Sequence, residues 1–195
     1  MATQRERSER TIAAILAAGR ELFAADGYDE VTIDAVVAQA GIAKGAFYHH
    51  FSSKKTLLDA VVDEMQGEIA DEFRANQRPQ PLSANDLADV LTDYLRRAAD
   101  PRRRRIVLLE GPEVLGWERW REIDDRHFAG MTRAAVAMTM SSAPDAPRVV
   151  AATQLVLGAV MEAALVAGRA DDPEAVVAQF GDVLGDFLSG LAASR

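Results

Sequence analysis

Residues 15–58 read ILAAGRELFAADGYDEVTIDAVVAQAGIAKGAFYHHFSSKKTLL, and this stretch decides the fold. Its first half completes a helix expected over about 8–25, because apolar residues recur there at spacings of three, four and seven. Gly27 is a natural stop for that helix. Thr32 is a suitable N-cap for a second helix. A short third helix is expected over about 43–49.

Three short helices with a glycine turn before the third are typical of a helix-turn-helix domain. The turn is expected at Gly41, because glycine enters a left-handed backbone conformation that other residues adopt only at a cost. Phe47 and Phe51 are expected to point into the core. Such a third helix fits the major groove of DNA and reads bases with its N-terminal residues. Its outward-facing residues are expected to be Lys44, Gly45, Ala46, Tyr48 and His49.

The charge distribution agrees with a DNA-facing surface in this stretch. The net charge of −8 is unusual for a DNA-binding protein, since basic patches supply much of the affinity. Within residues 1–57, however, basic and acidic residues balance, and residues 40–57 contain three lysines, two histidines and no acid. The excess acid therefore belongs to the rest of the chain, and the candidate DNA-facing segment is locally positive.

Residues 15–51 resemble the N-terminal domain of the TetR family of transcriptional regulators nearly position by position. The specific pieces are GY before the threonine cap, AGIAKG through the turn and FYHHFSSK after it. The resemblance implies that Thr32 caps the second helix and touches a phosphate, and that Lys54 binds a phosphate from the next helix. It also implies these contacts from the third helix: a phosphate or base edge for Lys44 and His49, bases for Gly45 and Ala46, and a phosphate for the Tyr48 hydroxyl.

Two positions depart from the family pattern. Position 43 is commonly Ser or Thr, which can cap the third helix, whereas Ala43 has no side-chain acceptor, and such a cap is worth about 1 kcal/mol. Position 55 is commonly acidic, whereas Lys55 adds positive charge beside Lys54. We expect the first change to reduce DNA affinity and the second to raise non-specific attraction.

Downstream of this domain the periodicity predicts six more helices and no sheet. Residues 78–81 (RPQP) are expected to form a linker, and Gly111-Pro112 is expected to break or kink the sixth helix. The fold class is therefore all-α with about nine helices. We assign residues 1–52 to an N-terminal DNA-binding helix-turn-helix domain and residues 53–195 to a ligand-binding and dimerisation domain, with a helix over 53–75 linking the two. The six further helices are expected over about 53–74, 84–99, 101–110, 117–140, 148–168 and 173–192.

The resemblance to the family continues weakly at residues 111–124, GPEVLGWERWREID, which are similar to part of some members' ligand domains. Family members bind a small molecule between their fourth and seventh helices. Aromatic residues at helical spacing are also typical of an ordinary core, and an acid such as Glu110 in apolar surroundings can receive a cationic ligand or be paired elsewhere. The candidate ligand-binding residues are Tyr94, Leu109, Glu110, Trp117, Trp120, Phe128 and Met131.

The last two expected helices carry more apolar surface than a monomer of this size should expose. Residues 149–168 are apolar enough to mimic a membrane span, but Glu162 near the middle would be costly in lipid, so a mostly buried helix is favoured. Family members usually dimerise through their last two helices, which predicts a symmetric homodimer. The candidate interface residues are Leu155, Val156, Ala159, Val160, Phe180, Val183, Leu184, Phe187 and Leu188.

Several other classes of function are disfavoured. The chain has no cysteine, which removes disulfides, thiolate zinc sites and cysteine nucleophiles. We expect no metal, no cofactor and no catalytic residue, because the sequence has no Ser/His/Asp arrangement, no metal-spaced cluster and no phosphate loop. The polar start of the chain has no apolar core of the secretory kind, which predicts a cytoplasmic protein without a membrane.

The sequence therefore predicts a TetR-type DNA-binding regulator and not an enzyme. We expect a homodimeric repressor that binds a near-palindromic operator in double-stranded DNA and is released by a small-molecule effector. The alternative is a ligand-independent regulator controlled by partners or abundance, for which a filled C-terminal core is expected. The run Arg102–Arg105 also has two interpretations, a solvated face or ion pairs against the DNA-binding domain.

Overall fold

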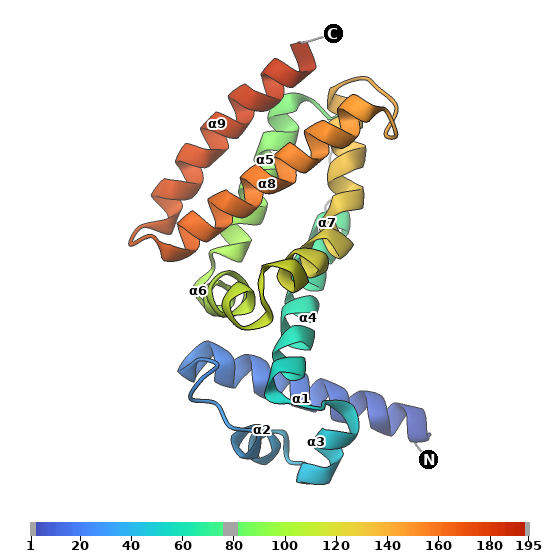
Figure 1. Cartoon of the computed structure of the whole chain (residues 1–195), viewed down its shortest axis with the longest axis vertical. Helices are drawn as coiled ribbons and strands as arrows, with labels where there is room; N and C mark the ends of the chain where they lie inside the picture. Colours follow the sequence, from blue (N-terminus) through green and yellow to red (C-terminus); the bar gives the residue numbers. More distant parts are fainter. Residues whose placement is uncertain (1–2, 76–81, 194–195) are drawn as a thin grey trace.

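The computed structural model describes residues 3–75 and 82–193, which form nine α-helices and one π-helix and contain no strand. The expected all-α fold with about nine helices is confirmed. The N-terminal helices form a small unit, α4 leads away from it, and the remaining helices form a larger bundle (Figure 1). The expected linker at residues 78–81 lies outside the described residues. The elements are α1 (Gln4–Asp26), α2 (Ile33–Ala40), α3 (Lys44–His50), α4 (Lys54–Ala75), α5 (Ala84–Ala98), α6 (Pro101–Arg104), η1 (Arg105–Leu115), α7 (Trp117–Thr139), α8 (Pro147–Arg169) and α9 (Pro173–Ala193).

The N-terminal unit is a three-helix domain closed by the start of α4. Helix α1 begins earlier than expected, because Thr3 and Glu6 form a capping box in which each side chain accepts from the other residue's backbone N–H. Gly41 ends α2 in the left-handed conformation, at φ 65°, as the sequence predicts. Phe47 and Phe51 are buried beneath α3, which confirms that this helix presents its other face outward.

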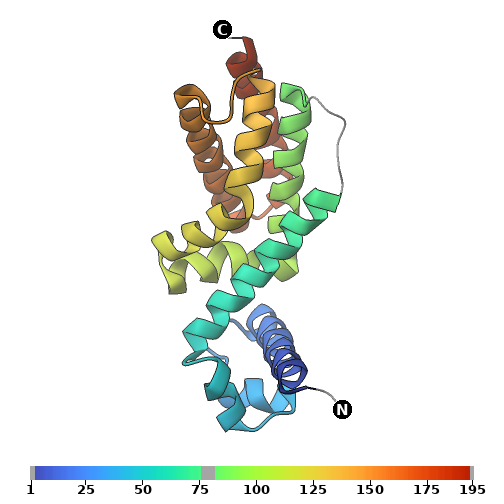
Figure 2. The ribbon, with the colours of Figure 1, turned by 90° about the vertical axis from the view of Figure 1, so that its right-hand side faces the viewer.

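Helix α4 connects the two parts and is buried along one stripe. Leu57 at its start lies against Gly19 of α1, and its later turns pack against η1 and α7. Figure 2 shows α4 running diagonally from the N-terminal unit into the bundle, where α5 packs against α8 and α9. The buried residues of α4 are Leu57, Leu58, Val61, Val62, Met65, Gln66, Ile69 and Ala70.

The helix that begins at Pro101 does not break at Gly111-Pro112, so of the expected break or kink the break is wrong. It continues to Leu115 as a π-helix, in which each N–H is directed to the carbonyl five residues earlier. Pro112 has no N–H to give to the carbonyl of Val107. Instead, the indole Nε1 of Trp120 donates to Val107 O at 2.8 Å, so a neighbouring helix replaces the missing donor.

A cluster of polar contacts joins η1 to the end of α1. The Arg105 guanidinium donates to the carbonyl oxygens of Ala24 and Ala25, at 3.3 and 2.7 Å. Glu110 Oε1 accepts from the backbone N–H of Tyr28 at 3.0 Å and lies 3.3 Å from Arg105 Nε. We call this set of contacts the interdomain joint. At Arg105, therefore, the arginine run contacts the N-terminal unit instead of forming only a solvated face.

Helices α8 and α9 leave an apolar face uncovered in the single chain. Leu155 and Val183 are 62% and 66% exposed, and Phe187 is 38% exposed. Of the other expected interface residues, Ala159 is exposed and Phe180 is half-buried. Four are at most 5% exposed because they lie on the inner faces of these helices, so their assignment to the interface is corrected: they belong to the protomer core. These four are Val156, Val160, Leu184 and Leu188.

The same two helices are long and apolar enough to cross a membrane by length and composition alone. In the most apolar 18-residue stretch of each helix, half of α8 and 17% of α9 are buried inside the protein. Core helices of globular proteins pass the same test, and here α8 and α9 pack against each other and against α5. Their apolar character is therefore weak evidence for a membrane span.

The contribution of the interdomain joint to stability can be measured by comparing substitutions at two glycines. Gly27 and Gly116 share nearly the same backbone, with φ 89° at both and ψ 161° and 153°. A Cβ at Gly27 would lie 2.9 Å from Arg105 Nη2 and from Glu110 Oε1, whereas a Cβ at Gly116 would meet nothing within 4 Å. Substitution by alanine thus imposes the same backbone strain at both positions but disturbs the joint at only one.

We expect Gly27→Ala and Gly116→Ala each to cost about 1–3 kcal/mol of stability through backbone strain. Gly27→Ala should cost about 1–2 kcal/mol more, because the displaced Arg105 and Glu110 side chains lose hydrogen bonds to α1. The difference between the two variants in thermal and urea unfolding measures this extra loss. Equal losses would show that the joint contributes nothing to stability.

Candidate nucleic-acid interface and ligand pocket

The outer face of α3 presents the side chains that the sequence assigns to DNA. Tyr48 is 51% exposed, although its ring edge packs on Phe47 with centroids 5.4 Å apart. Of the other residues expected to contact DNA, four are exposed and Ala46 is half-buried. A Cβ at Gly45 would meet nothing within 4 Å, so the backbone there is open to a close approach. The four exposed candidates are Thr32, Lys44, Gly45 and His49.

The two helices of this surface are capped differently. The Thr32 hydroxyl accepts from Ala35 N at 3.1 Å, which confirms that Thr32 caps α2. Helix α3 begins after Ala43 without a side-chain cap, as the departure from the family pattern predicts. The first backbone N–H groups of α3 therefore lack the side-chain acceptor that a Ser or Thr at position 43 would supply.

Lys44 is held by an acid in the free protein. Its Nζ lies 2.7 Å from Asp34 Oδ1, and hydrogen bonding to Asp34 raises the pKa of Lys44. Both side chains are more than half exposed, at 53% and 72%, so the pair adds little to stability. Asp34 nevertheless places a negative charge beside the first basic residue of the candidate surface.

Lys54 has a different role from the expected phosphate contact. Its ammonium group donates to the carbonyl oxygens of Tyr28, Asp29 and Val31, at 2.5, 3.2 and 2.8 Å, and lies 4.3 Å above the Tyr28 ring. An ammonium has three N–H donors, and all three are directed at this loop. Lys54 thus fixes the turn between α1 and α2, and the geometry argues against its assignment to a phosphate.

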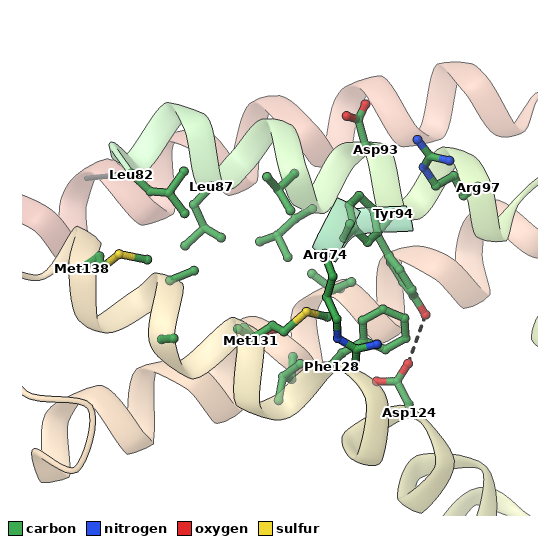
Figure 3. A pocket seen from close by; sticks show the side chains of 18 residues that line it. Arg74, Leu82, Leu87, Asp93, Tyr94, Arg97, Asp124, Phe128, Met131 and Met138 are labelled. Carbon is green, nitrogen blue, oxygen red and sulfur yellow. Dashed lines mark hydrogen bonds between the residues drawn. The ribbon is translucent and has the colours of Figure 1, made fainter. Parts of the chain in front are cut away.

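The bundle contains a cavity of about 510 Å³ between α4, α5, α7 and α8. A volume of this size suits a small organic molecule. Of the expected ligand-binding residues, Tyr94, Phe128 and Met131 line the cavity. The cavity is a slot, with Asp124 and Tyr94 at one end and Leu82 and Met138 at the other (Figure 3).

Four expected ligand-binding residues, in contrast, do not line this cavity. Trp120 is buried and donates to the π-helix, whereas Trp117 is 48% exposed at the start of α7. Glu110 belongs to the interdomain joint. Leu109 lies near Gly168 at the end of α8, where a Cβ on that glycine would be 3.7 Å from Leu109 Cδ2.

One end of the slot holds a buried polar cluster formed by Gln66, Tyr94 and Asp124. Asp124 is 3% exposed and its Oδ1 accepts two hydrogen bonds, from Tyr94 Oη and from Gln66 Nε2, both at 3.1 Å. Gln66 Nε2 is also 3.3 Å from Tyr94 Oη. Gln66 is fully buried, and its Oε1 has no hydrogen-bond partner among the described residues.

Burial raises the pKa of Asp124 to about 6, because desolvation disfavours the carboxylate. Its charged neighbours on α7 act in both directions: Asp125 raises the pKa, and Arg121 and His127 lower it, as does the hydrogen bond from Tyr94. Tyr94 itself has a pKa well above its ordinary value, since burial and the charge of Asp124 disfavour a phenolate. Tyr94 therefore acts as a neutral donor to Asp124.

The rim of the cavity carries arginines that are already paired with acids. Arg97 forms an ion pair with Glu72 and packs over the ring of Phe73, with 5.4 Å between guanidinium carbon and ring centroid. Arg74 forms an ion pair with Asp71 and is half exposed. The positive charges of these two arginines are therefore balanced by acids of α4, whereas Asp124 lines the cavity without an ion pair among the described residues.

Sequence reasoning missed Asp124 and Gln66. A signal for Asp124 was present, because it stands with Trp120, Phe128 and Met131 on the apolar stripe of α7 at spacings of three and four. A lone acid on an apolar stripe is a candidate buried charge. Gln66 has the same position on α4 between Val62 and Ile69, but a glutamine there carries a weaker signal.

Comparisons with known proteins agree over both parts of the chain. Residues 15–61 match the family model described as bacterial regulatory proteins of the tetR family. Residues 84–191, more than half of the chain, match the model described as the tetracyclin repressor-like C-terminal domain.

Individual relatives are more distant. The chain is 29% identical to the transposon Tn10 TetC protein of Escherichia coli over 134 residues, which cover 69% of this chain and 68% of TetC. It is 31% identical to the regulator UidR of E. coli over 81 residues, which cover 42% of this chain and only 39% of UidR. A solved TetR-family regulator from Pectobacterium atrosepticum is similar over 99% of this chain and 100% of its own, with 28% identity and a TM-score of 0.81.

The buried acid predicts a specific dependence of stability on pH. The pKa of Asp124 is 3.8 in an ordinary setting and about 6 in the folded protein, so the folded state binds this proton more tightly than the unfolded state. Burying the ionised carboxylate lowers the stability of the folded protein. This loss is absent below pH 4, develops between pH 4 and 6, and is fully present above pH 6. The corresponding penalty is about 3 kcal/mol at most.

We therefore expect Asp124→Asn to be more stable than the wild type at pH 7.5, by about 1–3 kcal/mol, and to lose this advantage at pH 4. Urea unfolding at several pH values between 4 and 8 measures the difference. Asp125→Asn is the matched control, since Asp125 is the adjacent acid on α7 and pairs with Arg121 at 3.4 Å. A lower stability for Asp124→Asn at every pH would contradict the assigned burial cost.

Proposed function

The chain belongs to the TetR family of transcriptional regulators, and from this membership we propose that it is a homodimeric repressor released from its operator by a small-molecule effector. The observation that carries the proposal is the coexistence in one chain of an exposed helix-turn-helix surface and a cavity of about 510 Å³. We assign residues 1–52 to DNA binding and 53–195 to ligand binding and dimerisation, with α4 linking them. The alternative of a ligand-independent regulator is less well supported. It predicts a C-terminal core without a sizeable cavity, whereas the described residues enclose one of about 510 Å³.

DNA binding is proposed for α3 as the recognition helix. Lys44, Tyr48 and His49 would contact phosphates or base edges, and the open backbone at Gly45 and Ala46 would approach the bases. In a dimer, two such helices would enter successive major grooves of a near-palindromic operator, about 34 Å apart. We propose that the protein acts in the cytoplasm without a membrane and without an enzymatic activity.

Communication between cavity and DNA surface is proposed to run through ion pairs along α4. At the cavity rim Arg97 pairs with Glu72, and Arg103 of α6 lies 3.4 Å from Glu72 and 3.5 Å from Glu68. Glu68 in turn binds Arg20 of α1, at 2.5 and 2.9 Å. These pairs connect a cavity-lining side chain to the DNA-binding unit, and the interdomain joint makes a second connection.

A shift of α4 at the cavity would therefore act on α1 as well. Coupling between two sites of this kind is typically about 1–3 kcal/mol, and it is reciprocal. The proposal thus requires that effector lowers operator affinity and that operator lowers effector affinity by the same factor.

The first test is DNA binding by the purified protein on the region upstream of its own gene. Footprinting should show a protected near-palindrome. Lys44→Ala should weaken binding by about tenfold and reduce the slope of log affinity against log salt by about one. Asp34→Asn should tighten binding, because it removes the acid beside Lys44.

Arg102→Ala is the matched control, since it removes an exposed cation from α6, far from α3. It should leave both the affinity and the salt dependence unchanged. An unchanged salt slope in Lys44→Ala would show that α3 is not the helix that contacts DNA.

The second test concerns the dimer. Leu155→Glu combined with Val183→Glu should give a monomer that keeps its helix content and loses operator binding, because both side chains are exposed in the single chain. Sedimentation analysis measures the mass. Trp117→Glu is the control, an exposed apolar residue at the start of α7 where an acid is tolerated, and it should remain dimeric. A dimeric double variant would place the interface elsewhere.

A further inference from the structure

At the buried end of the cavity, one oxygen of Asp124 receives no hydrogen bond from the described residues. Both hydrogen bonds to Asp124 end on Oδ1, and no described residue donates to its Oδ2. Gln66 donates to Asp124 but does not line the cavity, so Asp124 is the acceptor of this cluster that a ligand would reach. Asp124 has no ion-pair partner among the described residues, although it is 3% exposed and lines the cavity. A buried charge without a partner is costly, and a ligand with N–H donors and positive charge would relieve that cost.

The surroundings of Asp124 also suit a cation. The rings of Tyr94 and Phe128 meet edge to face with centroids 4.9 Å apart, and both line the cavity beside the carboxylate. Figure 3 shows these two rings and Asp124 gathered at one end of the slot. Aromatic faces attract cations most strongly where water is excluded.

The rest of the slot is apolar. Away from Asp124 it is lined by side chains such as Leu82, Leu87, Met131 and Met138, and the methionines lie along its α7 side (Figure 3). Methionine side chains adapt to different shapes, so this part of the cavity suits a flexible hydrocarbon chain.

We propose that the cavity takes an amphipathic ammonium compound, with its cationic head on Asp124 and Tyr94 and its apolar tail directed toward Met138. This inference rests on the proposed function, because it names the chemical class of the effector. The raised pKa of Asp124 agrees with it, since a bound cation would stabilise the ionised carboxylate that burial disfavours.

Figure 3 shows Arg74 and Arg97 toward the same end of the slot as Asp124, so an anion has to be considered there too. Arg74 and Arg97 line the cavity, but each is already paired with an acid of α4. They are 50% and 35% exposed, so an anionic head bound there would remain partly in water. The buried end, where a ligand loses most of its contact with water, carries the opposite charge, and this favours the cationic class.

The test uses three probes with one tail: decylamine, decanol and decanoate, titrated by calorimetry into the full-length protein without DNA. We expect decylamine to bind at least about tenfold more tightly than either other probe. Asp124→Asn should remove that preference, weakening decylamine by at least about tenfold. Decanol affinity should change little in the same variant. Asp125→Asn, the control, should keep the preference for decylamine.

Tightest binding by decanoate would overturn the proposal and place the head at the rim arginines. Equal decylamine affinity in wild type and Asp124→Asn would overturn it as well. A second measurement, operator affinity with and without decylamine, separates this inference from the proposed function. Decylamine binding that depends on Asp124 but leaves operator affinity unchanged would support the ligand class and contradict effector release. Release by decanoate alone would support effector release and contradict the ligand class.

Discussion

The continuous burial of one stripe of α4 constrains the rest of this structure. A helix of this length spans about 33 Å, and its apolar side is covered first by α1 and then by η1 and α7. Neither unit has a complete core without it. A packed helix moves as a rigid element. The cavity end of α4, where Phe73 and Arg74 lie, and its first turn, where Leu57 packs on α1, therefore cannot be displaced independently. The polar side of the same helix supplies Glu68 and Glu72, on which the arginines of α1, α5 and α6 converge.

A second feature of the fold is a proline that is accommodated without a break. Pro112 leaves the carbonyl of Val107 without a backbone donor, and the indole of Trp120 supplies one. This hydrogen bond ties η1 to α7. The same π-helix carries Arg105 and Glu110, whose side chains contact the end of α1 and the turn that follows it.

The candidate site shows where sequence reasoning succeeds and where it stops. Thr32 as a cap, the turn at Gly41 and the outward face of α3 were predictable because they depend on residues close together in the chain. Lys54 was assigned to a phosphate because the family pattern has a lysine there, but its ammonium is taken by three carbonyls of a loop more than twenty residues earlier. Glu110 likewise accepts from the backbone N–H of Tyr28, just after α1, and no local pattern predicts such a partner.

The sequence by itself determined an all-α chain, its helix-turn-helix, its family and the apolar character of its last two helices, because periodicity, caps and turn residues act over a few positions. The tertiary structure alone decided which members of each apolar stripe face a cavity, a core or solvent. It separated Tyr94, Phe128 and Met131 from Trp120, and it brought Gln66, Tyr94 and Asp124 from three helices into one buried cluster. The physical reason is that helix packing sets the rotation of each helix about its axis, and this rotation decides which side chains reach the interior.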